Sequence, residues 1–369
     1  MERFLPTAQF QRLVNLLRRD GYDCVGPRVR DGAIVYAPLE RVEELPVGWH
    51  DEQRPGHYRL ARGSGGRFFD WANGPEALKP LTFAAREVLW TVVRDERGGL
   101  RFREEVPEVR PTAVIGVRAC DIAAMHLQDQ HFGYREYQDP YYNRRRRALF
   151  LVAVDCARPA STCFCHSTGD GPAAHAGFDI ALTELDDGFI ARARSERGRD
   201  LLAELPTTEV TPDHRAAAAA QHEAAVAAQT RSIAGRNLKA SLFANLEHPA
   251  WEEVAGRCLS CGNCTSVCPT CFCHSVGDTT DLDGRRSAHH RQWDSCFSAG
   301  HSYMHSFVVR DRTVLRYRQW LTHKLGTWHD QYGRSGCVGC GRCITWCPVG
   351  IDMVDTANRI CGGDTDAQP

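Results

Sequence analysis

Two cysteine runs of identical spacing carry the clearest chemistry in this sequence. The runs are CLSCGNCTSVCP (258–269) and CVGCGRCITWCP (337–348), and both read C-x2-C-x2-C-x3-C-P. In iron–sulfur proteins with this spacing, three thiolates bind one [4Fe–4S] cluster and the fourth cysteine ligates the other cluster. We therefore expect two clusters with exchanged fourth ligands. The predicted ligands are Cys258, Cys261, Cys264 and Cys347 for the first cluster, and Cys337, Cys340, Cys343 and Cys268 for the second.

A zinc-binding interaction module is the alternative of another class, because paired C-x2-C motifs also build zinc sites. Zinc would take two pairs of cysteines around one ion, whereas this sequence has two complete four-cysteine runs. Each run also ends in a proline, Pro269 or Pro348, which turns the chain away after the last ligand because proline cannot continue a hydrogen-bonded helix. Iron–sulfur clusters are therefore the preferred interpretation.

A second repeat places further cysteines beside the first. TCFCHSTGD (162–170) and TCFCHSVGD (270–278) are nearly identical. In the first half, other cysteines follow the apolar runs AVIGV (113–117) and ALFLVAV (148–154), which are typical of strands buried on both faces. Ligands of open α/β sheets bind beyond the carboxyl ends of the strands, so we expect four of these thiols to converge there as a third [4Fe–4S] site. Its candidate ligands are Cys120, Cys156, Cys163 and Cys165.

Two alternatives to this third site stay open. Cys120 and Cys156 could be buried structural thiols, which are common in protein cores. A competing ligand set would come from the C-terminal half, either with a non-cysteine ligand or mixed with the first group, and comprises Cys271, Cys273 and Cys296. His166 and His274 lie beside the cysteine pairs, and they fit a position around the site better than a role as ligands.

The elements that must position these cysteines fall into two unequal parts. Residues 1–235 alternate helical patterns with apolar runs, and they are predicted to form an α/β domain that carries the candidate third site. Residues 236–369 are cysteine-rich and poor in strand signals, and they are predicted to form a helical, two-[4Fe–4S] ferredoxin-like domain. Its halves, 258–269 and 337–348, are separated by a long insertion, residues 270–336. We expect this insertion to pack on the N-terminal domain or on a partner.

Several individual elements follow from local patterns. The N-terminal segment is predicted to be an amphipathic helix with an apolar face formed by Phe10, Leu13, Val14 and Leu17. Residues 312–326 are also predicted to be helical, with apolar residues at the helical positions Val314, Tyr317, Leu321 and Leu325. The alanine-rich stretch 211–231 favours a helix, either as the connector between the two parts or as a packed helix of the first domain. AIVYAPL (33–39) is a further predicted strand.

Composition limits the possible locations and partners of the chain. The 369 residues are 43% hydrophobic and 25% charged, with a formal net charge of −1, so no bulk attraction to nucleic acid or to an acidic membrane is expected. No apolar run reaches the roughly 18 residues of a membrane span, and the N-terminus lacks the apolar core of a secretion signal. The chain is therefore expected in the cytoplasm, where reduced cysteines serve as metal ligands rather than in disulfides.

Two other features are not expected to form sites. The isolated Cys24 and Cys361 are not expected to bind metal, and the basic run Arg144–Arg147 is expected to be solvated or to face another subunit.

Seven segments together resemble one family of proteins. They are DEQRPGHYRL (51–60), GPEALKP (74–80), GVRACDIAAMHLQDQHF (116–132), DPYYNRRRRALFLVAVDCARPASTCFCHSTGDGP (139–172), CPTCFCH (268–274), WDSCF (293–297) and RYRQWLTHKL (316–325). The chain resembles the β subunit of soluble NAD(P)-linked [NiFe] hydrogenases, also called sulfhydrogenases or sulfur reductases. It is also similar to the electron-transfer subunit of anaerobic sulfite reductase, a sister family. The likeness is collinear over most of the chain and departs from the family at Ala119, where proline is expected, and in the alanine-rich segment.

The resemblance implies an electron-transfer role without substrate chemistry of its own. In this family the β subunit belongs to a heterotetramer with a [NiFe] large subunit, an iron–sulfur small subunit and a flavin- and NAD(P)-binding diaphorase subunit. The implied role is to relay electrons to or from NAD(P) through that flavin subunit. Electron transfer in an anaerobic sulfite or sulfur reductase is the alternative. In agreement with a non-catalytic subunit, the sequence has no G-x-G-x-x-G after a strand, no Walker loop and no nucleophile elbow.

Overall fold

A seven-stranded mixed sheet forms the centre of the N-terminal part. The computed structural model describes residues 2–134, 136–233, 235 and 237–362. The strand order in the sheet is β1 (Glu2–Pro6), β11 (Gly188–Ala193), β10 (Ile180–Glu184), β9 (Leu149–Val154), β8 (Thr112–Val117), β2 (Asp23–Arg30) and β3 (Ala33–Pro38). The inner strands β10, β9, β8 and β2 run parallel, and the outer pairs are antiparallel. The predicted strands at 33–39, 113–117 and 148–154 are therefore confirmed as β3, β8 and β9.

Helices cover both faces of this sheet, which explains why the inner strands are apolar throughout. On one face, α1 (Phe10–Arg19) and α6 (Glu196–Glu204) pack against alternate residues of β9, including Phe150 and Val152. On the other face, α3 (Ala119–Gln128) packs against Leu151. The predicted apolar face of the N-terminal helix is confirmed, because all four of its residues are fully buried: Phe10, Leu13, Val14 and Leu17.

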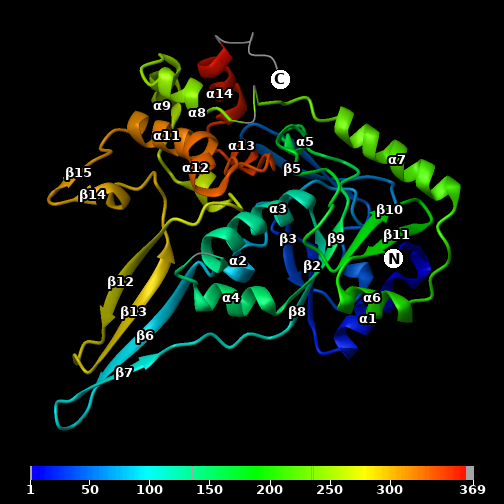
Figure 1. The fold of residues 1–369 in the computed structure, drawn as a ribbon, viewed down its shortest axis with the longest axis horizontal. Coiled ribbons are helices and arrows are strands. Elements are labelled where there is room, and N and C mark those ends of the chain that lie inside the picture. Colours follow the sequence, from blue (N-terminus) through cyan, green and yellow to red (C-terminus); the bar gives the residue numbers. More distant parts are fainter. Residues whose placement is uncertain (1, 135, 234, 236, 363–369) are drawn as a thin grey trace.

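A second, antiparallel sheet joins two distant parts of the chain. Its order is β12 (His274–Thr280), β13 (Arg286–Trp293), β6 (Arg86–Arg94) and β7 (Leu100–Glu104). The central pair is β13 with β6, in which Arg286 lies opposite Val93 and Gln292 opposite Arg86. Figure 1 shows these strands extending away from the rest of the molecule at the lower left. The C-terminal part, which is predicted to be helical, therefore also contains strands, since β12 and β13 lie within 270–336.

Helices of the C-terminal part enclose a separate apolar core. They are α8 (Lys239–Ala244), α9 (Ala250–Arg257), α10 (Asn263–Ser266), α11 (Thr313–Thr322), α12 (Trp328–Tyr332), α13 (Arg342–Thr345) and α14 (Met353–Cys361). Trp251 of α9, Tyr317 of α11 and Val354 of α14 meet in this core. The predicted helix at 312–326 is confirmed as α11 followed by a π-helical turn, η5 (His323–Thr327). All four of its predicted core residues are buried: Val314, Tyr317, Leu321 and Leu325.

The alanine-rich segment forms α7 (Pro212–Ala227), as predicted, and runs along the outside of the N-terminal part (Figure 1). Thr211 caps it by accepting a hydrogen bond from the His214 backbone N–H at 3.2 Å, which satisfies a free donor of the first turn. Shorter elements complete the fold: α2 (Lys79–Thr82), α4 (Pro140–Arg147), α5 (Cys165–Thr168), η1 (Thr7–Gln9), η2 (Val42–Glu44), η3 (Asp129–Gly133), η4 (Gly300–Ser302), and the hairpins β4 (Trp49–Arg54) with β5 (His57–Arg62) and β14 (Tyr303–Met304) with β15 (Phe307–Val308).

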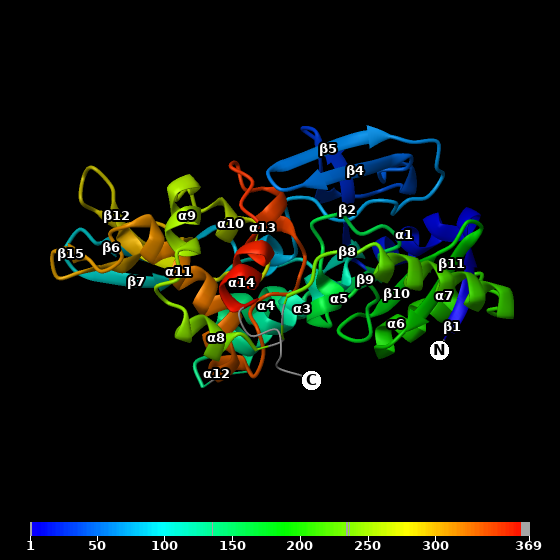
Figure 2. The same cartoon turned by 90° about the horizontal axis from the view of Figure 1, so that it is seen from above.

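The β4–β5 hairpin ties the second cysteine run to the N-terminal part. Figure 2 shows the hairpin in blue at the top of the molecule, beside the chain that leads to α13. The Gly56 N–H donates a hydrogen bond to the Ile344 carbonyl oxygen at 3.0 Å. Next to it, the ring of Tyr58 stacks on that of Trp346 with centroids 4.9 Å apart. The hairpin therefore fixes the position of the second run relative to the seven-stranded sheet.

Candidate metal centre

Each cysteine run folds into a loop that ends in one short helical turn. The turns are α10 in the first run and α13 in the second, and the two turns contact each other. Gly262 and Gly341 precede them, each with a φ of +74°, a left-handed conformation that glycine adopts without steric cost. A side chain at Gly341 would also collide with the Thr162 carbonyl oxygen, 2.5 Å away. The sequence repeat is thus a structural repeat, and its second copy packs closely on the first TCFC segment.

The eight ferredoxin-type cysteines line two pockets. The first pocket is lined by Cys258, Cys261, Cys264 and Cys347. The second is lined by Cys268, Cys337, Cys340 and Cys343. Each set of four takes three cysteines from one run and one from the other, which is the arrangement that the predicted pairing requires. Cys343 stands between the pockets and also borders the first.

The surroundings of the two pockets differ. The first pocket has aromatic walls from Phe297, Tyr317 and Trp320, and it reaches the surface at Cys261, which is exposed. The second pocket is more enclosed and contains a buried cation, Lys324. The first pocket is therefore apolar and partly exposed, whereas the second is buried and contains a charged group.

Burial keeps most of these thiols protonated in the metal-free chain. It raises the pKa of Cys258, Cys264, Cys340 and Cys343, and it raises the pKa of Cys337 to about 12. Cys268 is the exception, since its pKa lies well below the usual range because it accepts a hydrogen bond from the Cys271 thiol, with a further contribution from the charge of Lys324. Because the thiolate is the form that binds metal, loading of these pockets must release protons.

The four candidate ligands of the third site lie in one region next to the second pocket. Cys120 lies in the first turn of α3, which follows β8, and it shares a buried cluster with Cys165 and Cys340. The Cys163 Sγ lies 3.8 Å from the Cys340 carbonyl oxygen. Cys156 follows β9 and interacts electrostatically with both Cys163 and Cys165. The four thiols therefore lie beyond the carboxyl ends of β8 and β9, and their ligation of a cluster stays a prediction.

The competing group lies between the two pockets, beside the first cysteine run. Cys271 hydrogen-bonds to Cys268. Cys273 interacts with Cys296 and accepts a hydrogen bond from His301. Cys296 in turn interacts with the first-pocket residue Cys264. Both copies of the TCFC repeat border the second pocket, the first through Phe164 and the second through Thr270, while Cys273 and Cys296 extend the competing group toward the first pocket.

Sequence reasoning missed the polar residues that support the pockets. Arg342 of α13 forms a bidentate ion pair with Asp121 of α3, at 2.6 and 3.0 Å, and both side chains are 1% exposed. The Asn73 amide donates to the Cys340 carbonyl oxygen at 3.0 Å and lies 3.8 Å from the Cys163 Sγ. Asp121 belongs to the GVRACD segment, but no local pattern indicated that Arg342 would pair with it or that Asn73 would contact the second cysteine run.

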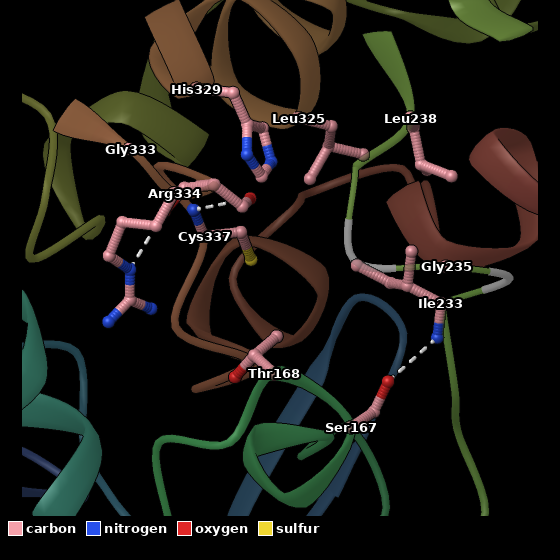
Figure 3. Close-up of a pocket in the computed structure, with 11 residues that line it drawn as sticks. Ser167, Thr168, Ile233, Gly235, Leu238, Leu325, His329, Gly333, Arg334 and Cys337 are labelled. Atoms are coloured by element: carbon pink, nitrogen blue, oxygen red, sulfur yellow. Dashed lines mark hydrogen bonds between the residues drawn. The ribbon is translucent and has the colours of Figure 1, made fainter. Parts of the chain in front are cut away.

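A further pocket lies on the other side of Cys337. Figure 3 shows Ser167 and Thr168 of the first TCFCHSTGD repeat on one side of it and His329 on the other. The Ser167 Oγ accepts a hydrogen bond from the backbone N–H of Ile233 at 3.1 Å, which holds the chain that leaves α7 against the repeat. This pocket places the first repeat beside a candidate ligand of the second cluster.

The remaining predicted features lie away from these pockets. In the basic run, Arg145 pairs with Glu87 at 2.7 Å and Arg146 with Asp129 at 3.0 Å, so half of its charge is neutralised within the chain. The two isolated cysteines, Cys24 and Cys361, lie in apolar cores. Within the described residues, no three His, Cys, Asp or Glu side chains are arranged to hold a single metal ion. No helix in that part of the chain is both long and apolar enough to cross a bilayer.

Comparison with known proteins gives two matches. Residues 257–351 match a family described as a 4Fe-4S dicluster domain, and this range contains both cysteine runs and the segment between them. The chain is 33% identical over 255 residues to sulfhydrogenase 2 subunit beta of Pyrococcus furiosus, an alignment that covers 68% of this chain and 74% of that protein. No solved structure matches the chain.

Proposed function

The chain belongs to the family of sulfhydrogenase beta subunits, and from this premise we propose that its eight ferredoxin-type cysteines hold two [4Fe–4S] clusters with exchanged fourth ligands. It is an iron–sulfur electron-transfer subunit of a hydrogenase-type complex. Such clusters, when bound, supply one-electron transfer. The residues of the chain supply the thiolates, set the spacing of the two pockets and shield them from water.

The observation that carries this proposal is the division of the eight cysteines between the two pockets. Each pocket offers at least four thiols, a donor set that suits an iron–sulfur cluster, and each combines both runs, in agreement with the spacing. The aromatic wall of Phe297, Tyr317 and Trp320 would exclude water from one side of the first site.

We further propose a third [4Fe–4S] cluster in the N-terminal part. Its ligands would be Cys120, Cys156, Cys163 and Cys165, which share one region beside the second pocket. Proximity to Cys340 would make this site the neighbour of the second cluster in an electron path. In this proposal, residues 1–235 and 236–369 are the two domains, and residues 270–336 are an insertion between the ferredoxin halves.

The partners that we propose are those of an NAD(P)-linked [NiFe] hydrogenase. The P. furiosus relative is named as one subunit of a sulfhydrogenase, so this chain would work beside [NiFe] large and small subunits and a flavin- and NAD(P)-binding subunit. A flavin supplies the two-electron hydride chemistry for which the sequence shows no motif of its own. The complex would act in the cytoplasm. An anaerobic sulfite or sulfur reductase is the second candidate, and the identity of the subunits that co-purify with the chain decides between the two.

Iron analysis after anaerobic reconstitution tests the cluster content. We expect about twelve irons per chain, since each [4Fe–4S] cluster contributes four, with broad absorption near 400 nm that bleaches with dithionite. Replacing Cys163 and Cys165 by serine should reduce the content to about eight irons. The matched control, Cys24→Ser, changes a cysteine in an apolar core and should leave the content unchanged.

Each other outcome has a defined meaning. About eight irons in the unmodified chain would remove the third cluster, and a smaller number would contradict the two-cluster proposal. A colourless protein with stoichiometric zinc would instead support a zinc-binding interaction module.

A further inference from the structure

Two buried lysines stand out because the chain has almost no others. Of its 45 lysine and arginine residues, three are lysines: Lys79, Lys239 and Lys324. Lys239 pairs with Asp330 at 2.7 Å, with its side chain 42% exposed. Lys79 and Lys324 are only 5% and 4% exposed. Because an ammonium group is strongly hydrated in water, its burial is costly unless other groups compensate its charge.

The surroundings of Lys324 show what could compensate its charge. Its Nζ lies 2.8 Å from the Thr270 Oγ1, 3.4 Å from the Cys268 Sγ and 3.5 Å from the Gly336 carbonyl oxygen. Among the ion pairs of the described residues, none joins a carboxylate to Lys324 or to Lys79. The nearest group that can carry a negative charge is therefore the sulfur of Cys268, a proposed ligand of the second cluster.

Lys79 approaches the same segment from the N-terminal part. Its Nζ donates to the backbone carbonyl oxygens of Thr265 and Ser266 at 3.3 and 3.0 Å, just before Cys268 in the chain. It also lies over the ring of Trp293, 3.9 Å from the centroid. Two ammonium groups, from α2 and from the π-helical turn η5, thus converge on the chain that carries Cys268.

We infer that Lys324, assisted by Lys79, raises the reduction potential of the second cluster and makes it the electron acceptor of the pair. The inference rests on the proposed function, because it requires a cluster in each pocket. Reduction adds one electron and one negative charge while no bond forms or breaks, and a nearby cation in a poorly polarisable interior stabilises that charge. The partners of the complex supply the electron, and Lys324 keeps its proton throughout.

The first pocket provides the internal comparison. The residues that line it include no lysine, arginine or histidine in the described part of the chain. Water near the exposed Cys261 would also stabilise the negative charge that reduction adds to the first cluster. Water molecules do so as dipoles that reorient, not as a fixed charge. In the second pocket, Lys324 is a full positive charge fixed 3.4 Å from a ligand sulfur. Two sites built from one sequence repeat are therefore electrostatically unequal.

Redox titrations followed by electron paramagnetic resonance test this inference in the reconstituted full-length chain. Lys324→Met keeps the length of the side chain and removes its charge. It should disfavour reduction of the second cluster at least tenfold, which corresponds to a fall of about 59 mV for one electron, and leave the first cluster unchanged. The matched control, Lys239→Met, removes a lysine charge away from both pockets and should shift neither potential. Cys261→Ser, which alters a ligand of the first cluster alone, assigns the signals.

The outcomes separate the inference from the proposed function. If Lys324→Met retains its iron and both potentials stay at their original values, the inference is wrong and the two-cluster proposal stands. If the unmodified chain does not hold two clusters, the proposed function itself is wrong. Should Lys324→Met lose the second cluster, Lys79→Met provides the test, because it removes a charge that does not contact a ligand sulfur. If Lys79→Met lowers the reduction potential of the second cluster alone, the inference is supported. If it leaves that potential unchanged, the inference is wrong.

Discussion

Arg342 and Asp121 form a completely buried ion pair between the second cysteine run and the helix that follows β8. The two side chains are joined by two hydrogen bonds, and Arg342 also donates to the Gly74 and Glu76 carbonyl oxygens at 2.9 and 3.2 Å. Breaking such a pair by removing one partner leaves an uncompensated charge in the interior. This pair therefore holds the loop of the second run against the N-terminal part.

Replacing Asp121 by alanine should lower the free energy of unfolding by about 3–5 kcal/mol, because the Arg342 charge would remain buried without its partner. Anaerobic chemical denaturation of the metal-free chain measures this change. Glu204→Ala is the matched control, since Glu204 pairs with Arg19 at the surface, where ion pairs contribute little to stability, and its loss should cost far less. A cost for Asp121→Ala as small as that of the control would contradict the role of the buried pair.

The exchange of fourth ligands makes a prediction at single cysteines. Because Cys347 lines the first pocket although it belongs to the second run, Cys347→Ala should damage the same cluster as Cys258→Ala. Electron paramagnetic resonance of the two variants should show loss of the same signal. Cys268→Ala is the matched comparison and should affect the other signal. Different signals lost from Cys347→Ala and Cys258→Ala would refute the exchange.

At the residue scale, the sequence indicates candidate ligands but not the polar residues that surround them. The cysteines of each run are recognisable because their spacing is local and repeats within the chain. The partner of Asp121 is 221 positions away, and Lys324 sits in a helix whose apolar pattern gives no sign of a buried cation. Contacts of this kind depend on how distant elements are packed, so a single sequence does not contain a local signal for them.

At the scale of elements, two helices of the fold continue into π-helical turns. One is η3, which follows α3, and the other is η5, which follows α11 and carries Lys324. His131 of η3 hydrogen-bonds to the Tyr332 hydroxyl at 2.8 Å and stacks on Phe272 with ring centroids 3.7 Å apart. Since π turns insert an extra residue into a helix and are common at functional sites, η5 fits a role in directing Lys324 into the second pocket.

The first residue of η5 predicts a pH dependence of stability. Burial, with a smaller contribution from the Lys324 charge, lowers the pKa of His323 to about 4. The unfolded chain, with an ordinary histidine pKa near 6.5, therefore binds a proton that the folded chain rejects. The free energy of unfolding is therefore unaffected by His323 above about pH 6.5. It falls as the pH drops toward 4, by up to roughly 3 kcal/mol, because only the unfolded chain takes up the proton.

Denaturation of the wild type and of His323→Gln between pH 4 and pH 7 measures this term. The wild type should lose more stability than the variant over that interval. His222→Gln, at an exposed position of α7, is the matched control and should follow the wild type. Parallel pH profiles for His323→Gln and the wild type would show that His323 does not titrate in this way.

The sequence predicts strands that are stabilised by burial of their own apolar residues, and it misses strands that depend on pairing with a distant strand. β8 and β9 are predictable because continuous apolar runs are required for strands buried on both faces. β12 and β13 escape prediction because their residues are mostly polar, and β13 pairs with a strand from the other half of the chain. Propensity is a weak guide where cross-strand pairing decides the structure.

At the scale of the whole molecule, the isolated chain should accept electrons without performing substrate chemistry. Its proposed clusters should be reducible by dithionite, but the chain should neither evolve hydrogen nor oxidise NADH or NADPH, because the sequence shows no motif for flavin, nicotinamide or nickel. With the partner subunits restored, hydrogen or reduced pyridine nucleotide should reduce the same clusters. Stoichiometric flavin in the isolated chain, together with NAD(P)H-dependent dye reduction, would overturn this assignment.

The pairing of β13 with β6 has a consequence for biosynthesis. β6 and β7 leave the ribosome about 200 residues before β13, which at usual rates of translation corresponds to roughly 10 to 40 seconds. During that time one edge of β6 has no partner, and unpaired strand edges promote association with other chains. Trp293, the residue that closes β13 and covers Lys79, also arrives late. The nascent chain therefore exposes the unpaired edge of the β6–β7 hairpin until most of its length has been made. Fragments that end before β13 should aggregate.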